Sequence, residues 1–305
     1  MKKFISRLVI LIAVLIAALY ITDTTYIIKA VRTIYFNGHT TAFLDDYTFS
    51  ENKTVKTGKS KAWPLHKNYN KIPATQKLLD LHKTQGTVAY LIIKNDSLLY
   101  EAYYDGYNED SRSNSFSMAK SYVSGLLGKA IMEGFIKSLE QPVSDFFPQY
   151  KEGLGAKVTV GDLASMASGS SWDESYYSPF SITTKAYYGE NLEDLTLGLT
   201  TEIEPGQAFK YASGDTQLLA MVIEKATGKK LYDYLSESFW IPLESENEAL
   251  WQVDSETNAM VKAYCCIATN AKDFARFGKL YKNHGKWNGK QILDSTFVAK
   301  SIQPR

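Results

Sequence analysis

The chain opens with an apolar run that basic residues precede. No charged side chain occurs from Leu8 to Thr22, whereas Lys2, Lys3 and Arg7 come before that run. Such a pattern is typical of a membrane-targeting segment whose amino end stays in the cytoplasm. Leu19-Tyr20-Ile21 is bulky where a cleavage site has small residues. We therefore predict an uncleaved anchor and keep a cleaved signal peptide, which would give a secreted protein, as the alternative.

Helical periodicity continues beyond the apolar run. Five apolar residues share one face of a predicted helix, with Lys29 and Arg32 between them: Ile27, Ile28, Val31, Ile34 and Tyr35. This spacing predicts a helix at the membrane interface, so residues 1–36 form an anchor or signal segment with a juxtamembrane helix. Residues 37–74 are polar and lysine-rich without a strong period, and we predict a tether with local turns there.

The pattern from residue 75 onward predicts a domain that mixes helices and strands. Residues 87–93 and 98–104 are strand-like and joined by Asn95-Asp96, which predicts a hairpin after a short helix at 75–84. Helical periodicity then dominates, at residues 216–227, 231–240 and 273–281. We predict an α/β (α+β) domain over 75–305, with a large helical region at about 111–259.

The composition narrows the possible partners and cofactors. The chain has 34 Lys and Arg against 33 Asp and Glu, a net charge of +1, which argues against nucleic-acid binding. No Cys/His cluster has metal-binding spacing, so we expect no metal and no other cofactor. Cys265 and Cys266 are adjacent, and we expect them not to pair with each other. The four histidines are scattered: His39, His66, His82 and His284.

The candidate chemistry begins at Ser117-Met118-Ala119-Lys120, just before an apolar stretch from Tyr122 to Phe135. Residues three apart share a helix face, which brings the Lys120 amine beside the Ser117 hydroxyl. The positive helix end favours the neutral amine, the form that accepts the hydroxyl proton in acyl transfer. The runs at 50–53 and 227–230 have the same pattern but open no apolar helix. The spacing alone fits a serine cap followed by a solvated lysine equally well.

Several ordered motifs resemble the serine hydrolase family of class C β-lactamases, DD-peptidases and related esterases, most of all its 6-aminohexanoate-dimer (nylon-oligomer) hydrolase branch. They are Ser115-Phe116-Ser117-Met118-Ala119-Lys120-Ser121, Glu133-Gly134-Phe135-Ile136, Gln141-Pro142-Val143, Trp172-Asp173-Glu174, Tyr211-Ala212-Ser213-Gly214-Asp215 and Asp273-Phe274-Ala275-Arg276-Phe277-Gly278. The resemblance covers roughly residues 88–304. It implies a β-lactamase/DD-peptidase-like fold, in which helices flank an antiparallel sheet, here preceded by the membrane segment.

The resemblance also implies roles for the matching residues. Ser117 would attack a carbonyl and become acylated, while Lys120 holds or accepts its proton. Tyr211 would be the second base and the proton donor to the leaving group. The backbone N–H of Ser117 would provide half of an oxyanion hole. Three further residues would bind substrate: Ser213, Trp172 and Asp215.

The chain departs from the family pattern in three ways. Trp172 stands where the branch has a tyrosine near the leaving amide, and an indole cannot exchange protons as a phenol does. The Tyr-Ala-Ser motif lacks the asparagine typical of β-lactamases. We therefore expect poor turnover of the nylon oligomer and of β-lactams. Family members also continue past Arg305 into strands that complete the sheet, so we expect a C-terminally incomplete domain. Lys56-Thr57-Gly58 resembles the Lys-x-Gly motif of those strands but precedes the nucleophile, and we interpret it as a coincidence.

These observations predict a membrane-anchored, extracytoplasmic serine hydrolase of the bacterial cell envelope, on the periplasmic or cell-surface side. It would cleave an amide or ester bond of a small molecule or peptide through a Ser117 acyl-enzyme. The alternative is a noncatalytic, penicillin-binding-like protein that binds a ligand or regulates. A Ser-His-Asp α/β-hydrolase is disfavoured because the chain has no Gly-x-Ser-x-Gly elbow.

Overall fold

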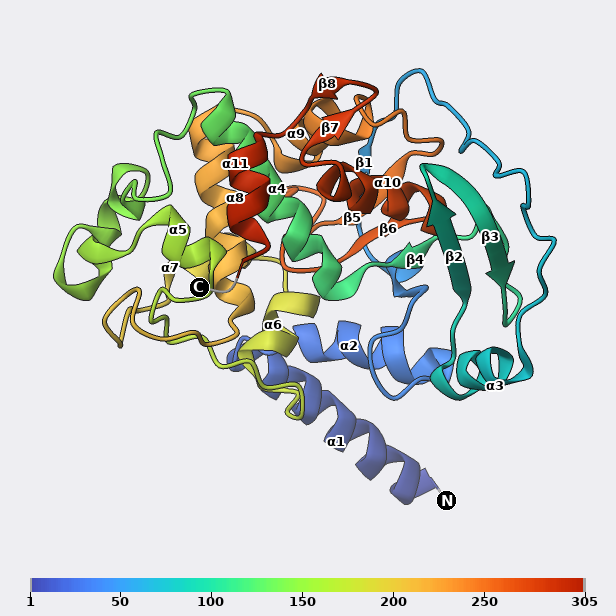
Figure 1. Cartoon of the computed structure of the whole chain (residues 1–305). Helices are drawn as coiled ribbons and strands as arrows, with labels where there is room; N and C mark the ends of the chain where they lie inside the picture. The colour runs from blue at the N-terminus through green and yellow to red at the C-terminus, as the bar shows by residue number, and fades with distance from the viewer. Residues whose placement is uncertain (1, 304–305) are drawn as a thin grey trace. The chain divides into compact units, whose positions relative to one another are not determined.

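The computed structural model describes residues 2–303 (Figure 1). The chain forms two compact units, each assembled from three stretches. Unit 1 contains Met1–Asn52, Leu139–Val222 and Gln252–Tyr264. Unit 2 contains Lys53–Ser138, Ile223–Trp251 and Cys265–Arg305.

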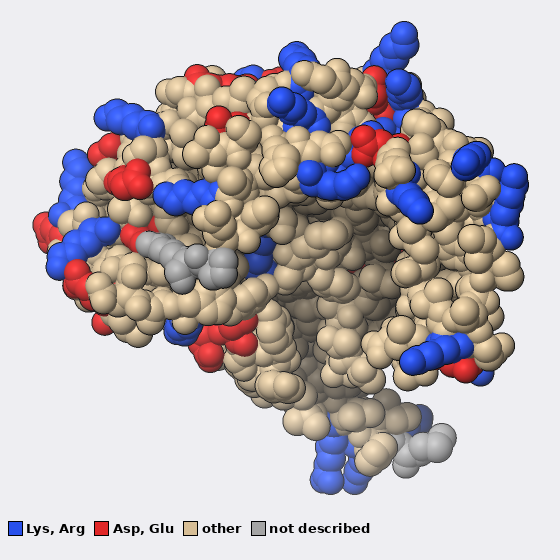
Figure 2. Space-filling view, in the orientation of Figure 1, with Lys and Arg blue, Asp and Glu red and all other residues tan. Residues whose placement is uncertain are grey.

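Unit 1 begins with the apolar helix α1 (Lys2–Ile21), which has 20 residues and no buried side chain. At 1.5 Å per residue such a helix is about 30 Å long, the thickness of the hydrocarbon core of a bilayer. Among the described residues it is the one helix long and apolar enough to cross a membrane. A signal sequence meets the same criteria, so α1 is a candidate for either role. On the face shown in Figure 2, basic side chains gather at the amino-terminal end of α1.

The helix predicted after the apolar run is present as α2 (Tyr26–Ile34). Its apolar side packs on protein, because Tyr26 and Ala30 form a buried cluster with Tyr188, and Ile27 and Ile34 pack against it. Tyr188 ends helix α6 (Ile182–Tyr188), which lies beside α2 in Figure 1. Part of the surface expected at the membrane interface is therefore covered by unit 1 itself.

The other helices of unit 1 are short, except for α8 (Ser213–Thr227), of which the first ten residues belong to this unit. Helix α5 (Val160–Ala164) begins with a capping box, in which Thr159 and Asp162 satisfy each other's backbone N–H groups. Asn191 caps α7 (Leu192–Leu197). Single turns connect these elements: η1 (Tyr35–Asn37), η2 (Asp46–Phe49), η4 (Val143–Asp145), η5 (Pro148–Tyr150) and η6 (Gly153–Lys157).

A four-stranded sheet lies mostly in unit 2, with the strand order β1-β5-β6-β4. Its strands are β1 (Asn52–Val55), β5 (Ala249–Gln252), β6 (Ile267–Thr269) and β4 (Ser113–Asn114). Strand β6 pairs antiparallel with both β5 and β4, as predicted for this fold. The predicted hairpin is present as a separate two-stranded sheet of β2 (Ala89–Lys94) and β3 (Ser97–Tyr103). A further small hairpin joins β7 (Lys286–Trp287) to β8 (Lys290–Gln291).

Helix α4 (Ala119–Met132) is the central helix of unit 2 and follows the turn η3 (Phe116–Met118). It packs closely because glycines face aromatic rings: a Cβ at Gly128 would lie 2.4 Å from the Phe297 ring, and one at Gly125 would lie 2.9 Å from the Phe277 ring. The other helical elements of the unit are α3 (Gln76–Gln85), α9 (Leu231–Leu235), the π-helical turn η7 (Ser236–Trp240), α10 (Ala271–Lys282) and α11 (Ser295–Ser301).

Much of the segment that we predicted as a tether is packed against the rest of the chain. Val55, at the end of β1, is fully buried, and Trp63 is only 6% exposed. The Trp63 indole donates a hydrogen bond of 3.0 Å to the carbonyl of Lys272. The Thr57 hydroxyl donates to the carbonyl of Ser245, so Lys56-Thr57-Gly58 serves packing in unit 2. Apolar and indole contacts thus hold a stretch whose composition suggested a solvated linker.

Contrary to our expectation, Cys265 and Cys266 form a disulfide. Both residues are buried and precede β6 directly. The pairing of neighbours is accompanied by a left-handed main chain at Cys266, with φ of 80°.

Candidate active site

Ser117 lies in the turn η3, where the chain passes from β4 into α4. The Nζ of Lys120 donates a hydrogen bond of 3.0 Å to the Oγ of Ser117. The three-residue spacing therefore brings amine and hydroxyl together, as the sequence predicted. Ser117 is exposed and Lys120 is half-buried, which leaves the hydroxyl accessible to a substrate. At this distance a neutral lysine can accept the serine proton directly.

The turn that carries Ser117 is held by strand β6. The N–H of Ser115 donates to the carbonyl of Ile267 at 2.7 Å, and the N–H of Ile267 donates to the Ser115 hydroxyl at 3.1 Å. Asn114 accepts from the N–H of Phe116 at 2.9 Å. Phe116 has φ of 43°, a left-handed conformation that costs a bulky residue about 1–3 kcal/mol. The flanking hydrogen bonds offset this strain, which is concentrated directly before the candidate nucleophile.

The backbone N–H of Ser117 is available to a substrate. Within residues 2–303 it has no hydrogen-bond acceptor, although its neighbours Ser115, Phe116 and Met118 all donate within the turn or to β6. A free donor next to the Ser117 hydroxyl has the position that one donor of an oxyanion hole would need.

Tyr211 lies in unit 1, directly before α8, and is 38% exposed. Ser213 begins that helix, and its side chain is engaged with protein: the Ser213 hydroxyl and N–H donate to the Glu174 carboxylate at 2.7 and 2.6 Å. The Trp172 indole donates to the same carboxylate at 2.7 Å, and the Tyr176 hydroxyl donates to it as well. Glu174 thus joins two residues that the sequence assigned to substrate binding.

Sequence reasoning placed Glu174 in a motif but assigned it no role. Its partners lie two and thirty-nine residues away, and only the nearer one is visible from local spacing. The available signal was two neighbouring carboxylates, Asp173 and Glu174, directly after a tryptophan and within a stretch rich in hydroxyl-bearing residues. Because this carboxylate holds the first residue of α8, it also fixes the path of the chain next to Tyr211.

Asp215, the third predicted substrate-binding residue, is only 2% exposed. It accepts a hydrogen bond of 2.6 Å from the Ser168 hydroxyl. Burial raises the pKa of the Asp215 carboxyl to about 7, and the hydrogen bond from Ser168 opposes this rise only in part. With these contacts, Asp215 supports the first turn of α8.

The motif at 273–278 forms a buried ionic network in unit 2. Arg276 contacts Asp273 at 3.0 Å and Glu246 at 2.8 Å. Asp273 in turn accepts from the N–H groups of Glu246 and Asn247, at 2.8 and 2.9 Å. The motif therefore fixes the loop before β5. In the described part of the chain, no group of three or more His, Cys, Asp or Glu is arranged to hold a metal ion.

Comparison with known proteins identifies the family. Residues 75–304 match the Beta-lactamase family, which is well over half of the chain. This protein belongs to the β-lactamase family. The chain is 26% identical over 222 residues to the 6-aminohexanoate-dimer hydrolase of Paenarthrobacter ureafaciens, an alignment that covers 70% of this chain and 56% of that protein. The chain therefore spans little more than half the length of this relative.

Solved structures agree with this assignment. A putative 6-aminohexanoate-dimer hydrolase from Bacillus anthracis superimposes with a TM-score of 0.73 at 25% identity, over 85% of this chain and 72% of the other. A penicillin-binding protein from Bacillus halodurans gives a TM-score of 0.60 at 14% identity, over 74% and 78%. The predicted family and fold class are confirmed, and two of the relatives named here carry the name of a hydrolase.

Proposed function

We propose that this member of the β-lactamase family cleaves an amide or ester bond through an acyl-enzyme on Ser117. The observation that carries the proposal is the 3.0 Å hydrogen bond between Lys120 and the exposed Ser117 at the start of α4. A lysine amine within hydrogen-bonding distance of a serine hydroxyl is one of the known ways to activate this nucleophile.

In the proposed reaction, Lys120 accepts the hydroxyl proton while the Ser117 oxygen bonds to the substrate carbonyl carbon. The carbonyl oxygen becomes an oxyanion, which the N–H of Ser117 stabilises. The C–N or C–O bond then breaks, and the leaving group takes up a proton. Water attacks the resulting ester, which releases the acid and restores the Ser117 hydroxyl.

We assign the proton transfer to the leaving group to Tyr211. Support for this role comes from the Tyr-Ala-Ser motif and from the exposure of the side chain. A phenol can both donate and accept a hydrogen bond, as the step requires. The contacts of Glu174 with Ser213 and Trp172 hold the chain next to Tyr211.

Small amides and esters are the proposed substrates. One relative is named for the hydrolysis of a 6-aminohexanoate dimer, which is a small amide. Trp172 donates its indole N–H to Glu174, and an indole has no second proton to exchange. We therefore propose a substrate other than the nylon oligomer, with Ser213, Trp172 and Asp215 shaping its pocket indirectly.

By the same proposal, α1 anchors the chain in a membrane and the remaining residues lie outside the cytoplasm. Support comes from the length of α1, the absence of buried side chains among its residues and the basic residues at its amino end. A chain that resists extraction from membranes at alkaline pH, and that added protease digests in intact cells, would meet both parts of this proposal.

Phosphonylation by a fluorophosphonate, followed by intact-mass spectrometry, tests the proposed function. We expect one adduct on the full chain, formed as Ser117 displaces fluoride from phosphorus. Ser117→Ala should abolish the adduct, and Lys120→Met should slow its formation by about a hundredfold or more. Ser121→Ala is the matched control, because Ser121 is an exposed serine in the first turn of α4, the helix that follows Ser117.

The same assay distinguishes the proposed hydrolase from the noncatalytic alternative. A folded chain that gives no adduct, yet is protected by a penicillin against thermal unfolding, would favour ligand binding without turnover. An adduct that persists in Ser117→Ala would show that another residue reacts and would refute the assignment of the nucleophile.

A further inference from the structure

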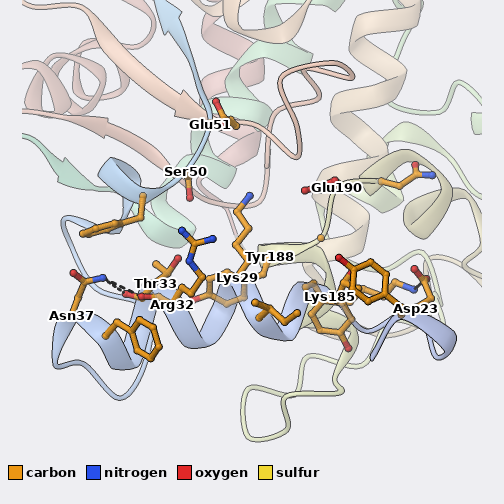
Figure 3. A pocket seen from close by; sticks show the side chains of 18 of the residues that line it. Asp23, Lys29, Arg32, Thr33, Asn37, Ser50, Glu51, Lys185, Tyr188 and Glu190 are labelled. Atoms are coloured by element: carbon orange, nitrogen blue, oxygen red, sulfur yellow. Dashed lines mark hydrogen bonds and ion pairs between the residues drawn. The ribbon is translucent and has the colours of Figure 1, made fainter. Parts of the chain in front are cut away.

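Unit 1 contains a cavity of about 1110 Å³ that lies apart from Ser117 in the sequence and uses none of the proposed catalytic residues. Its lining runs from the last turn of α1 along α2, and the opposite wall comes from the end of η2 and from the chain after α6 (Figure 3). A cavity of this size accommodates an organic ligand larger than an inorganic ion.

Two basic side chains enter this cavity from the same face of α2. Lys29 and Arg32 are three residues apart, and Figure 3 shows both extending from the helix toward the segment that carries Ser50. Neither forms an ion pair with any described residue, whereas Lys185, which also lines the cavity, is paired with Asp23 at 2.7 Å. Two neighbouring cations without a carboxylate partner favour a phosphate group.

Two carboxylates also line the cavity. Glu51 and Glu190 form no ion pair with Lys29, with Arg32 or with another described residue. The cavity thus offers two unpaired cations and two unpaired anions. A ligand that carries both a phosphate and a primary ammonium group would satisfy both pairs.

Part of the remaining wall is apolar, and the cavity begins where α1 ends. Tyr20 in the last turn of α1, Ile28 on α2, and the exposed rings of Phe36 and Phe49 all take part in the lining. If α1 spans a bilayer, its last turn lies at the interface between hydrocarbon and water, where lipid headgroups are found. Aromatic and aliphatic walls at this level suit the glycerol and acyl part of a lipid.

We propose that this cavity binds the headgroup of a zwitterionic aminophospholipid from the membrane in which α1 is anchored. Lys29, Arg32 and the Ser50 hydroxyl contact the phosphate, Glu51 and Glu190 contact the ammonium, and Phe36 and Phe49 contact the upper acyl chain. The inference rests on the proposed membrane insertion of α1. Such a lipid would hold unit 1 in a defined orientation on the membrane surface.

Native mass spectrometry of the full chain in detergent tests the proposal, with phosphatidylethanolamine, phosphatidylglycerol and phosphatidylcholine of equal acyl length added in equal amounts. We expect phosphatidylethanolamine to be retained in preference to the other two lipids. Lys29→Gln with Arg32→Gln should weaken its retention by about 25-fold, because each basic residue near a membrane surface contributes about fivefold. Lys67→Gln with Lys71→Gln removes the same charge at exposed positions outside the cavity and should change nothing.

The carboxylates are tested separately. Glu51→Gln with Glu190→Gln should preserve lipid binding but lower the ratio of phosphatidylethanolamine to phosphatidylglycerol about fivefold or more, because the ammonium loses its partners. Glycerophosphoethanolamine, which is the headgroup without acyl chains, should compete poorly. Displacement by it at an equal concentration would mean that the cavity recognises a soluble zwitterion, and the lipid assignment would be wrong.

The outcomes separate this inference from the proposed anchoring. Flotation of the full chain with phosphatidylcholine vesicles reports on α1 alone and should be equal in all variants. If the chain floats but shows no lipid selectivity, or if the selectivity persists in both double variants, the proposed lipid site is wrong. The proposed anchoring by α1 is unaffected by either result. A chain that does not float refutes both proposals, whereas acylation of Ser117 is independent of either result.

Discussion

Replacement of Arg276 by alanine is expected to lower the free energy of unfolding by about 3–5 kcal/mol, the usual cost of removing one partner from a buried ion pair. Arg276 is 2% exposed and contacts the carboxylates of Asp273 and Glu246 at 3.0 and 2.8 Å. It also donates to the carbonyls of Leu243 and Lys61, at 3.1 and 2.6 Å. The substitution would leave the fully buried Asp273 without its cation and two carbonyls without a donor.

Two features of the structure affect how much stability the Arg276→Ala variant loses. Asp273 retains the two N–H donors of Glu246 and Asn247, so its desolvation is partly offset in the variant. The guanidinium also lies 5.4 Å from the Trp63 ring and 6.0 Å from the Trp287 ring, and these contacts are lost as well. A loss below about 1 kcal/mol would be typical of an exposed pair and would refute the buried network.

Urea unfolding followed by tryptophan fluorescence measures this effect, because Trp63 and Trp287 lie next to the substituted side chain. Lys282→Ala is the control: this lysine is on the same helix, is mostly exposed and lies 3.5 Å from Asp96, so a change within about 0.5 kcal/mol is expected. A double-mutant cycle with Asp273→Ala should show coupling of more than about 0.5 kcal/mol, since the two residues are in contact. Additive losses would mean that the ion pair itself contributes nothing.

Two further predictions concern packing and pH. Gly128→Ala should destabilise unit 2 by about 1–3 kcal/mol in the same assay, because the new Cβ would lie 2.4 Å from Phe297. Gly278→Ala, in a helix with open space around the new methyl group, should be neutral or stabilising, and equal effects at both sites would contradict the packing of α4. Asp215 has a folded-state pKa of about 7, above its unfolded value near 4, so the folded state binds more protons between these values and stability falls as pH rises from about 4 to 7. Asp215→Asn should remove this component, at most about 4 kcal/mol, and an unchanged difference between variant and wild type across this range would refute the raised pKa.

Local patterns were sufficient for several elements and for the contact between Ser117 and Lys120. The spacing from Ser117 to Lys120 predicted their contact, because residues three apart on a helix are neighbours whatever surrounds the helix. Alternation with Asn95-Asp96 predicted the hairpin β2-β3, and helical periodicity predicted α10. These features depend on interactions within one or two turns of the chain.

The tertiary structure decided which polar groups serve each other. The sequence assigned Ser213 and Trp172 to substrate binding. In the structure both side chains donate hydrogen bonds to the Glu174 carboxylate. In the sequence, Arg276 was part of a family motif without an assigned role. The structure shows that it pairs with Glu246, which is thirty residues away in the chain. No periodicity encodes such partners, because they are selected by burial: a polar group removed from water requires a hydrogen bond from whatever the fold places next to it.

The same distinction applies at the amino end of the chain. The apolar run and the helical period that follows it could be identified from the order of residues alone, and α1 and α2 are where that order predicted them. That α2 is covered in part by Tyr188, while Lys29 and Arg32 face a cavity, depended on packing against residues more than 150 positions later. Sequence order determines which side of a helix is apolar, whereas only the packed chain determines what covers that side, because contacts between distant segments form only when the chain folds.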